Sequence, residues 1–533
     1  SQISGAGDVT MIAGRDVNAQ AAYVEAGNQL GVGAGRDISI TAATERSEFE
    51  SHHKSTGSSG ALSKKTVTTH DVVNRETAQG ALFSGDTVIL QADNNLLVQG
   101  SNIVGDNDVH LAAGNNLTLT TAEEHNQESH QRQEKKSGFS GTGGIGFSYG
   151  KQSLKVTDTA QDTTHRGSTI GSINGNVTLS AGSDLNVHGS ELIAGQDMTL
   201  AGKNVSITAA TDSGTQTHTV EQKTSGLTLA LSGTAGSALN TAAQTVQEAK
   251  SADSERLAAL QGTKAALSGV QAVQAGRLAE AQGDSPENNN AIGVSLSYGS
   301  QSSTSTQRSE QRTAQGSSLT AGDNLSVVAR GSGVKGHGGD LTVQGSQLQA
   351  GRDLLLSANR DLNLLSAANT SSLEGKNESH GGTAGIGIGA GQGGWGISVS
   401  ASANKAKGSE QGSGVTHTET QVSAGREVTL VSGHDTTLQG AQVSGEKIRA
   451  DVARNLTLTS EQDSDRYDSK QQSASAGGSF TFGSMTGSAN VNLSRDKMHS
   501  TWQSVEEQTG LFAGKGGFDV TAGGHTQLNG AVI

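Results

Sequence analysis

Short runs in which aliphatic residues alternate with Thr, Ser or Gln recur along the chain, separated by Gly, Asn and Asp. The stretch VILQADNNLLVQGSNIVGDNDVHLAAGNNLTLT, which begins at Val88, shows the pattern clearly. A period of two is typical of β-strands with one buried face, and Gly, Asn and Asp form the tight turns between such strands. The pattern therefore predicts an all-β protein built from short strands.

A longer phrase also repeats. It reads AGRDISITAATE from Ala34, GNNLTLTTAEE from Gly114, GKNVSITAATD from Gly202, NRDLNLLSAAN from Asn359 and ARNLTLTSEQD from Ala453. Equivalent turn residues also recur at about 20-residue intervals, as Asp16 and Asp37 do. A repeat of this length, with two or three strands in it, is typical of one coil of a solenoid. We predict a parallel β-helix with three faces and about 20 residues per coil, whose turn Asn and Asp side chains bond along the stack.

The chain is expected to be a single β-helix array over 1–533, in which coil segments alternate with polar insertions. The coil segments are predicted at 1–44, 80–121, 169–211, 317–370, 421–460 and 509–533. The insertions are predicted at 45–79, 122–168, 212–316, 371–420 and 461–508, each as a long antiparallel β-hairpin that projects from the rod. Residues 241–282 are rich in Ala and Gln and carry apolar residues at helical spacing, which predicts one inserted α-helical segment.

The composition favours an elongated solenoid over a wide globular core. Only 32% of the residues are apolar and 3% are aromatic, whereas a conventional enzyme of this size needs more large apolar side chains. The single Pro leaves the ladder hydrogen-bond donors intact. The lack of Cys excludes disulfides and thiolate chemistry, and the net charge of -14 argues against a nucleic-acid partner.

Two further sequence features concern the chain as a whole. No apolar run approaches the roughly 18 residues of a membrane-spanning helix. The sequence begins Ser-Gln, without an initiator Met or a signal peptide, so we expect this chain to be part of a longer protein.

The sequence offers little support for catalysis or metal binding. Acids occupy single turn positions, among them Asp16, Asp37, Asp86 and Asp197, and do not form a cluster of the kind that β-helix lyases use. His52, His53 and the other His residues lack metal-ligand spacing. The Gly-rich runs from Gly141 and Gly387 open no predicted helix, which excludes them as phosphate loops. We expect no catalytic residue, metal, cofactor or small-molecule substrate.

The hairpin strands place apolar residues on one side. A bilayer-spanning strand needs about 9–11 residues in which apolar side chains alternate with small or polar ones, and the hairpin centres show this alternation. The predicted membrane-contact residues are Ile145, Phe147, Tyr149, Leu227, Leu229, Leu231, Ile292, Val294, Leu296, Tyr298, Ile386, Ile388, Trp395, Ile397, Val399, Phe480, Phe482, Val491 and Leu493. The alternative is that these faces lie on the rod or on one another, because one-sided strands are ordinary in soluble proteins.

The repeated phrases, each followed by a polar insertion, resemble the haemagglutinin repeats of filamentous-haemagglutinin-like exoproteins, which are exported by two-partner secretion. The order of phrase and insertion is most similar to the second repeat region of contact-dependent growth inhibition effectors, and the resemblance covers essentially the whole chain. The resemblance implies a right-handed β-helix on the surface of a Gram-negative bacterium. In these effectors the region precedes a C-terminal toxin and is held back, in the periplasm, until the target is engaged.

The family resemblance favours a non-enzymatic delivery module that associates with the target cell's outer membrane and helps the toxin cross it. Its expected partners are that membrane with its proteins and the C-terminal toxin of the same parent chain. We expect the strands to be docked in the soluble form and to insert at the target surface. The alternative function is an adhesin stalk that uses the same hairpins for attachment, and a polysaccharide lyase is a more distant alternative.

Overall fold

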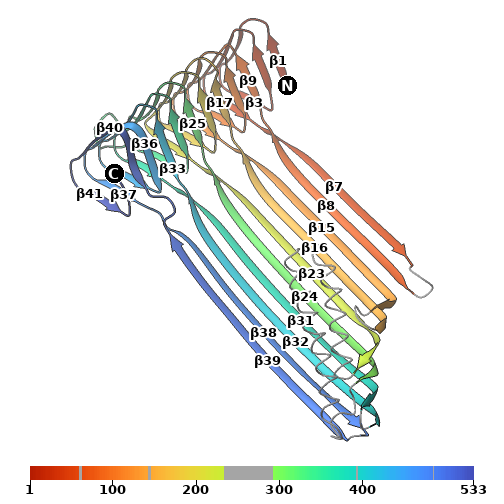
Figure 1. Cartoon of the computed structure of the whole chain (residues 1–533). Helices are drawn as coiled ribbons and strands as arrows, with labels where there is room; N and C mark the ends of the chain where they lie inside the picture. Colours follow the sequence, from red (N-terminus) through yellow and green to blue (C-terminus); the bar gives the residue numbers. More distant parts are fainter. Residues whose placement is uncertain (59–62, 142–145, 233–291, 392–393, 484) are drawn as a thin grey trace.

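The computed structural model describes residues 1–58, 63–141, 146–232, 292–391, 394–483 and 485–533. All regular structure in these ranges is β-strand, as the alternation predicts. The strands form a rod, at the top of Figure 1, and one large sheet that projects from it. The predicted helical segment 241–282 lies outside the described residues.

The rod is a parallel β-helix with three faces, as predicted. The first face contains β1 (Gln2–Gly5), β4 (Tyr23–Ala26), β9 (Leu82–Gly85), β12 (Asn102–Gly105), β17 (Thr169–Ser172), β20 (Glu191–Ala194), β25 (Ser318–Ala321), β28 (Gln347–Ala350), β33 (Thr420–Ala424) and parts of β36 (Ala441–Val452) and β40 (Gly510–Ala522). The second contains β2 (Val9–Ala13), β5 (Gln29–Ala34), β10 (Thr87–Ala92), β13 (Val109–Ala113), β18 (Val177–Ala181), β21 (Met198–Gly202), β26 (Leu325–Ala329), β29 (Asp353–Ala358), β34 (Glu427–Ser432) and the remainder of β36 and β40.

The third face is an 11-stranded sheet. It contains β3 (Val17–Gln20), β6 (Ile38–Thr41), β11 (Leu96–Gln99), β14 (Leu117–Thr120), β19 (Asp184–His188), β22 (Asn204–Thr208), β27 (Leu341–Gln344), β30 (Leu362–Leu365), β35 (Thr436–Gln439), β37 (Leu456–Thr459) and β41 (Thr526–Asn529). The first two faces together form a 20-stranded sheet, because β36 and β40 each run through both.

Stacked aliphatic side chains fill the interior of the rod. Alternate residues of each strand point inward, and each stacks on the equivalent residue of the next rung. Leu30 pairs with Val88, Val88 with Val109 and Val109 with Val177, and all four are at most 1% exposed. Each buried aliphatic side chain contributes roughly 1.5–3 kcal/mol, so this narrow column stabilises the rod along its whole length.

Polar turn residues form ladders on the outside of the rod. The Asn94 side-chain Nδ2 donates to Asp37 Oδ1 at 2.8 Å, which confirms the predicted stacking of turn Asn and Asp. The Arg454 guanidinium donates to Asp435, and the backbone N–H of Asn455 donates to the same carboxylate. These hydrogen bonds, with Arg454 first among them, lower the pKa of Asp435 to about 2. The turn acids therefore hold rungs together.

Every hairpin leaves the rod at one corner, after the third strand of every second rung. In the other rungs a left-handed residue closes this corner, for example Gly100 with φ +54° and Gly345 with φ +56°. A Cβ atom on Gly100 would lie 2.6 Å from the Cβ of Ala122, at the base of a hairpin. Gly100 is thus required both for its backbone conformation and for the close approach of the next rung.

A column of buried hydroxyl groups lines the same corner. Its members are Ser101, Ser168, Ser190, Ser317, Ser346, Thr420 and Thr509, each at most 3% exposed. The hydroxyl of Ser317 accepts the N–H of Ser190 at 3.2 Å and donates to the carbonyl of Thr208 at 2.8 Å. These bonds satisfy buried backbone groups where the chain leaves the ladder for a hairpin. This column was not predicted from the sequence.

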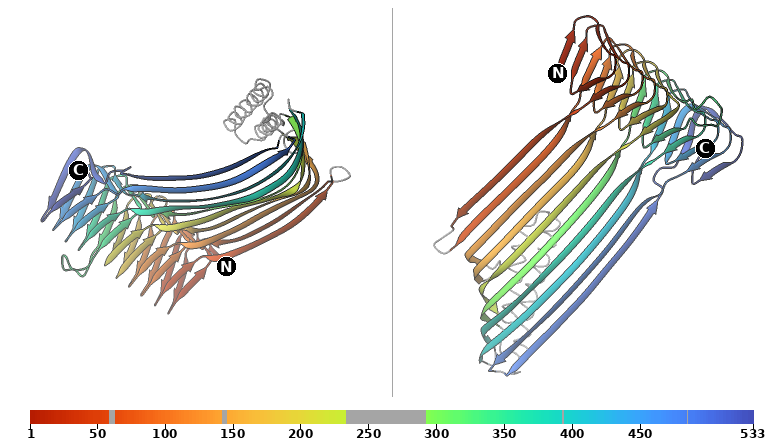
Figure 2. Two further views of the ribbon diagram at one scale, coloured as in Figure 1. Left: turned by 90° about the horizontal axis from the view of Figure 1, so that it is seen from below. Right: turned by 180° about the vertical axis from the view of Figure 1, so that it is seen from behind.

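The hairpins join edge to edge into one 10-stranded antiparallel sheet, called here the wing (Figure 1). Its strands are β7 (Ala43–Gly57), β8 (Lys64–Gln79), β15 (Ala122–Gly141), β16 (Gly146–Arg166), β23 (Ala210–Ser232), β24 (Ile292–Gln315), β31 (Ala367–Gly391), β32 (Gly394–Thr418), β38 (Asp463–Phe482) and β39 (Thr486–Ser504). The antiparallel hairpins are as predicted. The pairing of each hairpin with its neighbours was not predicted. Figure 2 shows that the wing extends sideways from the rod and curls at its far end.

We expect Ser317→Ala to lower the free energy of unfolding by about 1–3 kcal/mol, because it leaves the buried N–H of Ser190 and carbonyl of Thr208 without this partner. Urea titration followed by circular dichroism measures the change. The control is Ser326→Ala on β26, where the side chain is half-buried and alternates with buried Leu325 and Val327. Equal effects of the two substitutions would show that the hydroxyl column contributes nothing specific.

Candidate functional site

An apolar stripe crosses one face of the wing at its far end. The cross-strand register places Leu229 opposite Leu296, Leu296 opposite Ile386, Ile386 opposite Val399 and Val399 opposite Phe480. Residues directly opposite one another in a ladder lie on the same face, so residues far apart in sequence form continuous rows. We define the apolar stripe as Tyr149, Leu227, Leu229, Val294, Leu296, Tyr298, Ile386, Ile388, Ile397, Val399, Phe480 and Phe482.

The side chains of the apolar stripe are exposed. Their exposed fractions range from 37% at Phe480 to 57% at Tyr298 and Ile386, and Leu229 is half-buried. The opposite face at the same level is polar, because Ser148, Thr228, Ser297, Ser400 and Ser479 share one row there. A contiguous exposed apolar surface of this kind, on an otherwise polar sheet, is a candidate binding surface.

The remaining predicted residues divide into two groups. Phe147, Leu231, Ile292 and Trp395 lie on wing strands near the stripe, where only their backbone is described, and Ile145 lies outside the described residues. Val491 and Leu493 lie on β39, 68% and 78% exposed. They pair with Ala476 and Ala474, so they share the face of the stripe but stand nearer the rod.

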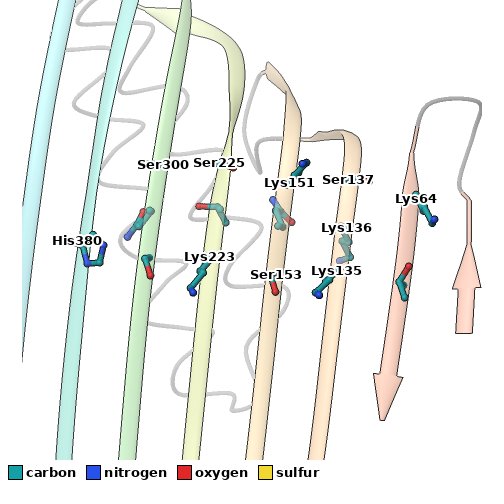
Figure 3. A pocket seen from close by; sticks show the side chains of 15 residues that line it. Lys64, Lys135, Lys136, Ser137, Lys151, Ser153, Lys223, Ser225, Ser300 and His380 are labelled. Carbon is teal, nitrogen blue, oxygen red and sulfur yellow. The ribbon is translucent and has the colours of Figure 1, made fainter. Parts of the chain in front are cut away.

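Lysine side chains lie beside the apolar stripe on the same face. Lys135 and Lys223 belong to one row, in which Lys135 is opposite Ser153, Ser153 opposite Lys223, Lys223 opposite Ser302 and Ser302 opposite His380. Lys64 and Lys151 belong to the next row toward the tip, together with Ser137, Ser225 and Ser300. We define Lys64, Lys135, Lys151, Lys223 and His380 as the lysine band. Figure 3 shows the band crossing β8, β15, β16, β23 and β31.

The lysine band lines a groove of about 580 Å³ that also contains Ser and Thr side chains. All five band residues are exposed. This groove and its lysines were not predicted from the sequence, although a signal was present. Lys135, Ser137 and Phe139 alternate along β15 as Lys223, Ser225 and Leu227 do along β23, so each strand places cations just before its apolar residues.

A cluster of acids stands where β32 meets the rod. Burial raises the pKa of Glu419 to about 7, and the carboxyl groups of Glu507 and Asp463 add to the increase. Asp463 Oδ1 in turn lies 2.9 Å from His417 Nδ1. A half-buried acid beside a second carboxyl resembles an acid–base pair. Its position at the base of a hairpin, among residues that connect the wing to the rod, instead favours a structural role.

The turn ladder contains one group with the spacing of a cation site. Ligand atoms of Asp361, His434 and Asp435 lie within 4.8 Å of one another. Arg360 lies 3.2 Å from Asp361, and Arg454 donates to Asp435, so both carboxylates already have cationic partners. Ionic partners of this kind are typical of a structural ladder. No helix in the described ranges is long and apolar enough to cross a bilayer.

We expect Glu419→Gln to stabilise the fold at pH 8 by an amount on the order of 1 kcal/mol, discounted for partial exposure to water. The raised pKa of Glu419 means that its contribution is most favourable below its ordinary pKa near 4.5 and is lost as pH rises through about 7. The variant should therefore differ little from the wild type at pH 4. Urea titrations at both pH values test this, and a gain at pH 4 alone would contradict the assigned direction.

We expect Leu296→Thr in the apolar stripe to change the free energy of unfolding by less than about 1 kcal/mol, because the side chain is 51% exposed and lies opposite Leu229 and Ile386 on an open sheet face. Leu348→Ala in the rod, where Leu348 is 1% exposed, should cost about 2–5 kcal/mol. Unfolding of both variants in urea measures the contrast. A loss at Leu296 as large as that at Leu348 would mean that the stripe serves folding.

Comparison with known proteins identifies the repeat. The model of the hemagglutinin repeat family matches residues 1–72, 61–161, 147–283 and 296–474. A 16S rRNA endonuclease CdiA of Enterobacter cloacae is 50% identical over 536 residues, covering 100% of this chain and 16% of that protein. A tRNA nuclease CdiA of Escherichia coli (strain STEC_O31) is 50% identical over 97% of this chain and 16% of its own length.

A third relative is a deoxyribonuclease CdiA of Yersinia pseudotuberculosis, 50% identical over 82% of this chain and 40% of its own length. No solved structure matches the chain. The chain thus spans only 16% of the length of the first two relatives, whose names describe the activities of much longer proteins. With family matches over most of its length and these relatives, the chain belongs to the hemagglutinin repeat family, in the form that CdiA proteins carry.

Proposed function

We propose that this region is a non-enzymatic delivery module of a contact-dependent growth inhibition exoprotein. It associates with the outer membrane of the target cell and assists the passage of a C-terminal toxin carried by the same parent chain. The exoprotein is secreted to the surface of the producing cell by two-partner secretion and holds this region in the periplasm before deployment. The relatives' nuclease names do not bear on this region, because it covers a small part of each of the first two proteins.

The apolar stripe is the observation that carries the proposal. It is exposed, lies on one face, and stands at the end of the wing remote from the rod (Figure 2). Its strands alternate apolar with small or polar residues, as lipid-facing strands do. A rigid rod that holds such a surface away from itself is suited to present it to a second membrane.

The lysine band supports a membrane partner as well. Cations beside an apolar surface match the boundary between acyl chains and anionic head groups. The acidic chain, with its net charge of -14, makes this local positive surface stand out.

The alternative is an adhesin stalk in which the same wing attaches the cell to a surface. The two functions predict different effects of removing the apolar stripe on cell attachment and on toxin entry. A delivery module needs the stripe after the target is bound, whereas an adhesin needs it for binding itself.

The test replaces Leu229, Leu296 and Ile386 together with Thr in the full-length exoprotein displayed by inhibitor cells. We expect killing of target cells to fall at least tenfold while attachment to those cells is kept, because the central row of the stripe no longer offers apolar surface to lipid. Viable counts of target cells and flow cytometry of mixed-cell aggregates give the two readouts.

The control replaces Thr228, Ser297 and Ser400 with Ala on the opposite face of the same strands. This variant should kill and attach as the wild type does. Loss of attachment in the stripe variant would support the adhesin function, and unchanged killing would remove the stripe from toxin delivery altogether.

A further inference from the structure

We propose that the lysine band binds the anionic phosphate groups of lipid heads when the wing meets a membrane. The inference rests on the proposed function, since it assumes that the apolar stripe contacts lipid. It adds that the membrane contact includes ionic binding of phosphate, and it assigns this binding to four lysines, Lys64, Lys135, Lys151 and Lys223.

The band and the stripe have a fixed separation along the strands. On β15, Lys135, Ser137 and Phe139 point to one face, so the lysine stands two side-chain steps from the first apolar row. Each step of two residues along a strand covers about 7 Å. The head-group layer of a bilayer is about 5–8 Å thick on each side. A lysine side chain is long and flexible, so by extending along the sheet toward the tip it can reach the phosphates of a membrane whose acyl chains meet the stripe.

The charge of the band is not neutralised by the wing itself. In the part of the chain that the structure describes, no ion pair joins Lys64, Lys135, Lys151 or Lys223 to a carboxylate, and the two rows of the band hold Ser, Thr, His and Gly in place of acids. Two of these lysines, Lys135 and Lys223, stand two strands apart, about 10 Å, so salt at physiological strength screens their repulsion.

The opposite face of the same strands shows what a neutralised arrangement looks like. There Glu134 lies 2.8 Å from the Nζ of Lys136 and 3.1 Å from that of Lys65. The same contrast holds nearer the rod on the band's own face, where Lys155 pairs with Glu221 at 3.8 Å. Lys376, Lys470 and Lys497 also lack an ion pair in the described residues, but they stand nearer the rod on the stripe's face. Of these lysines, only those of the band border the apolar stripe.

The hydroxyl groups between the lysines complete an anion-binding surface. Ser153 and Ser302 alternate with Lys135, Lys223 and His380 across one row. Hydroxyl O–H groups and ammonium N–H groups both donate to phosphate oxygens. A row that alternates the two can hold several head groups side by side, and the groove leaves room for them.

A row of glycines on the opposite face of the wing lies at the level of the boundary between the lysine band and the apolar stripe. Gly150 lies opposite Gly226, and Gly226 opposite Gly299, in the register between the two rows of side chains. A Cβ atom on Gly150 would lie 2.2 Å from the carbonyl oxygen of Ser225. The backbones of β16 and β23 approach closely at this level. The register of these strands therefore fixes the distance between the lysine band and the apolar stripe.

The test measures sedimentation of the purified 533-residue chain with vesicles of phosphatidylcholine and phosphatidylglycerol, at rising NaCl concentrations. Substituting Lys135, Lys151 and Lys223 together with Gln should weaken binding roughly 100-fold, since each lysine near an anionic surface contributes a factor of about five. Substituting the same three residues with Arg should preserve binding. The control changes Lys203, Lys447 and Lys515 of the rod to Gln, which alters net charge equally and should leave binding unchanged.

The stripe variant, with Thr at Leu229, Leu296 and Ile386, distinguishes phosphate binding by the lysine band from membrane contact by the apolar stripe. Loss of vesicle binding in the stripe variant with full binding in the Lys→Gln variant would overturn the lysine band and keep the membrane contact. Equal binding to vesicles of phosphatidylcholine alone would likewise overturn the phosphate assignment. If the wild type binds no vesicles, both proposals fall. Unfolding midpoints equal to that of the wild type confirm that each variant is folded.

Discussion

The spacing of backbone hydrogen bonds is the constraint on which the rest of this molecule depends. Stacked rungs of the rod and neighbouring strands of a sheet are separated by the same distance, about 4.8 Å. A hairpin after every second rung therefore supplies two strands for each two rungs of rise. Successive hairpins arrive at the spacing that lets them pair with one another, and the wing forms as a continuation of the helix.

The rod and the wing share this strand spacing but differ in how they are stabilised. The rod excludes water, because Leu, Val and Ile stack inside it and the hydroxyl column satisfies the corner where the chain departs. The wing has few buried side chains and two polar faces over most of its area. An open sheet of this kind is held by its hydrogen-bond ladders and by its attachment to the rod. Apolar residues at its far end are then free for contact with another surface.

Much of the fold follows from local pattern. The alternation of aliphatic and polar residues, the period near 20 and the turn Asn and Asp predict the three-faced β-helix, and Asn94 bonded to Asp37 shows the expected ladder. The hairpins follow as well, because the strands predicted around Leu227 and Tyr298 pair with one another although these two residues are 71 positions apart in the chain. The hydroxyl column was missed because a lone Ser or Thr after a turn looks like any surface residue.

The positions of apolar and cationic residues within each hairpin can be read from the local sequence of that hairpin. Their assembly into a stripe and a band was decided by tertiary structure alone. The row from Leu229 through Ile386 to Phe480 exists because separate hairpins share one register. That register is set by the stacking of rungs in the rod, and no local pattern within a hairpin encodes its alignment with the next one.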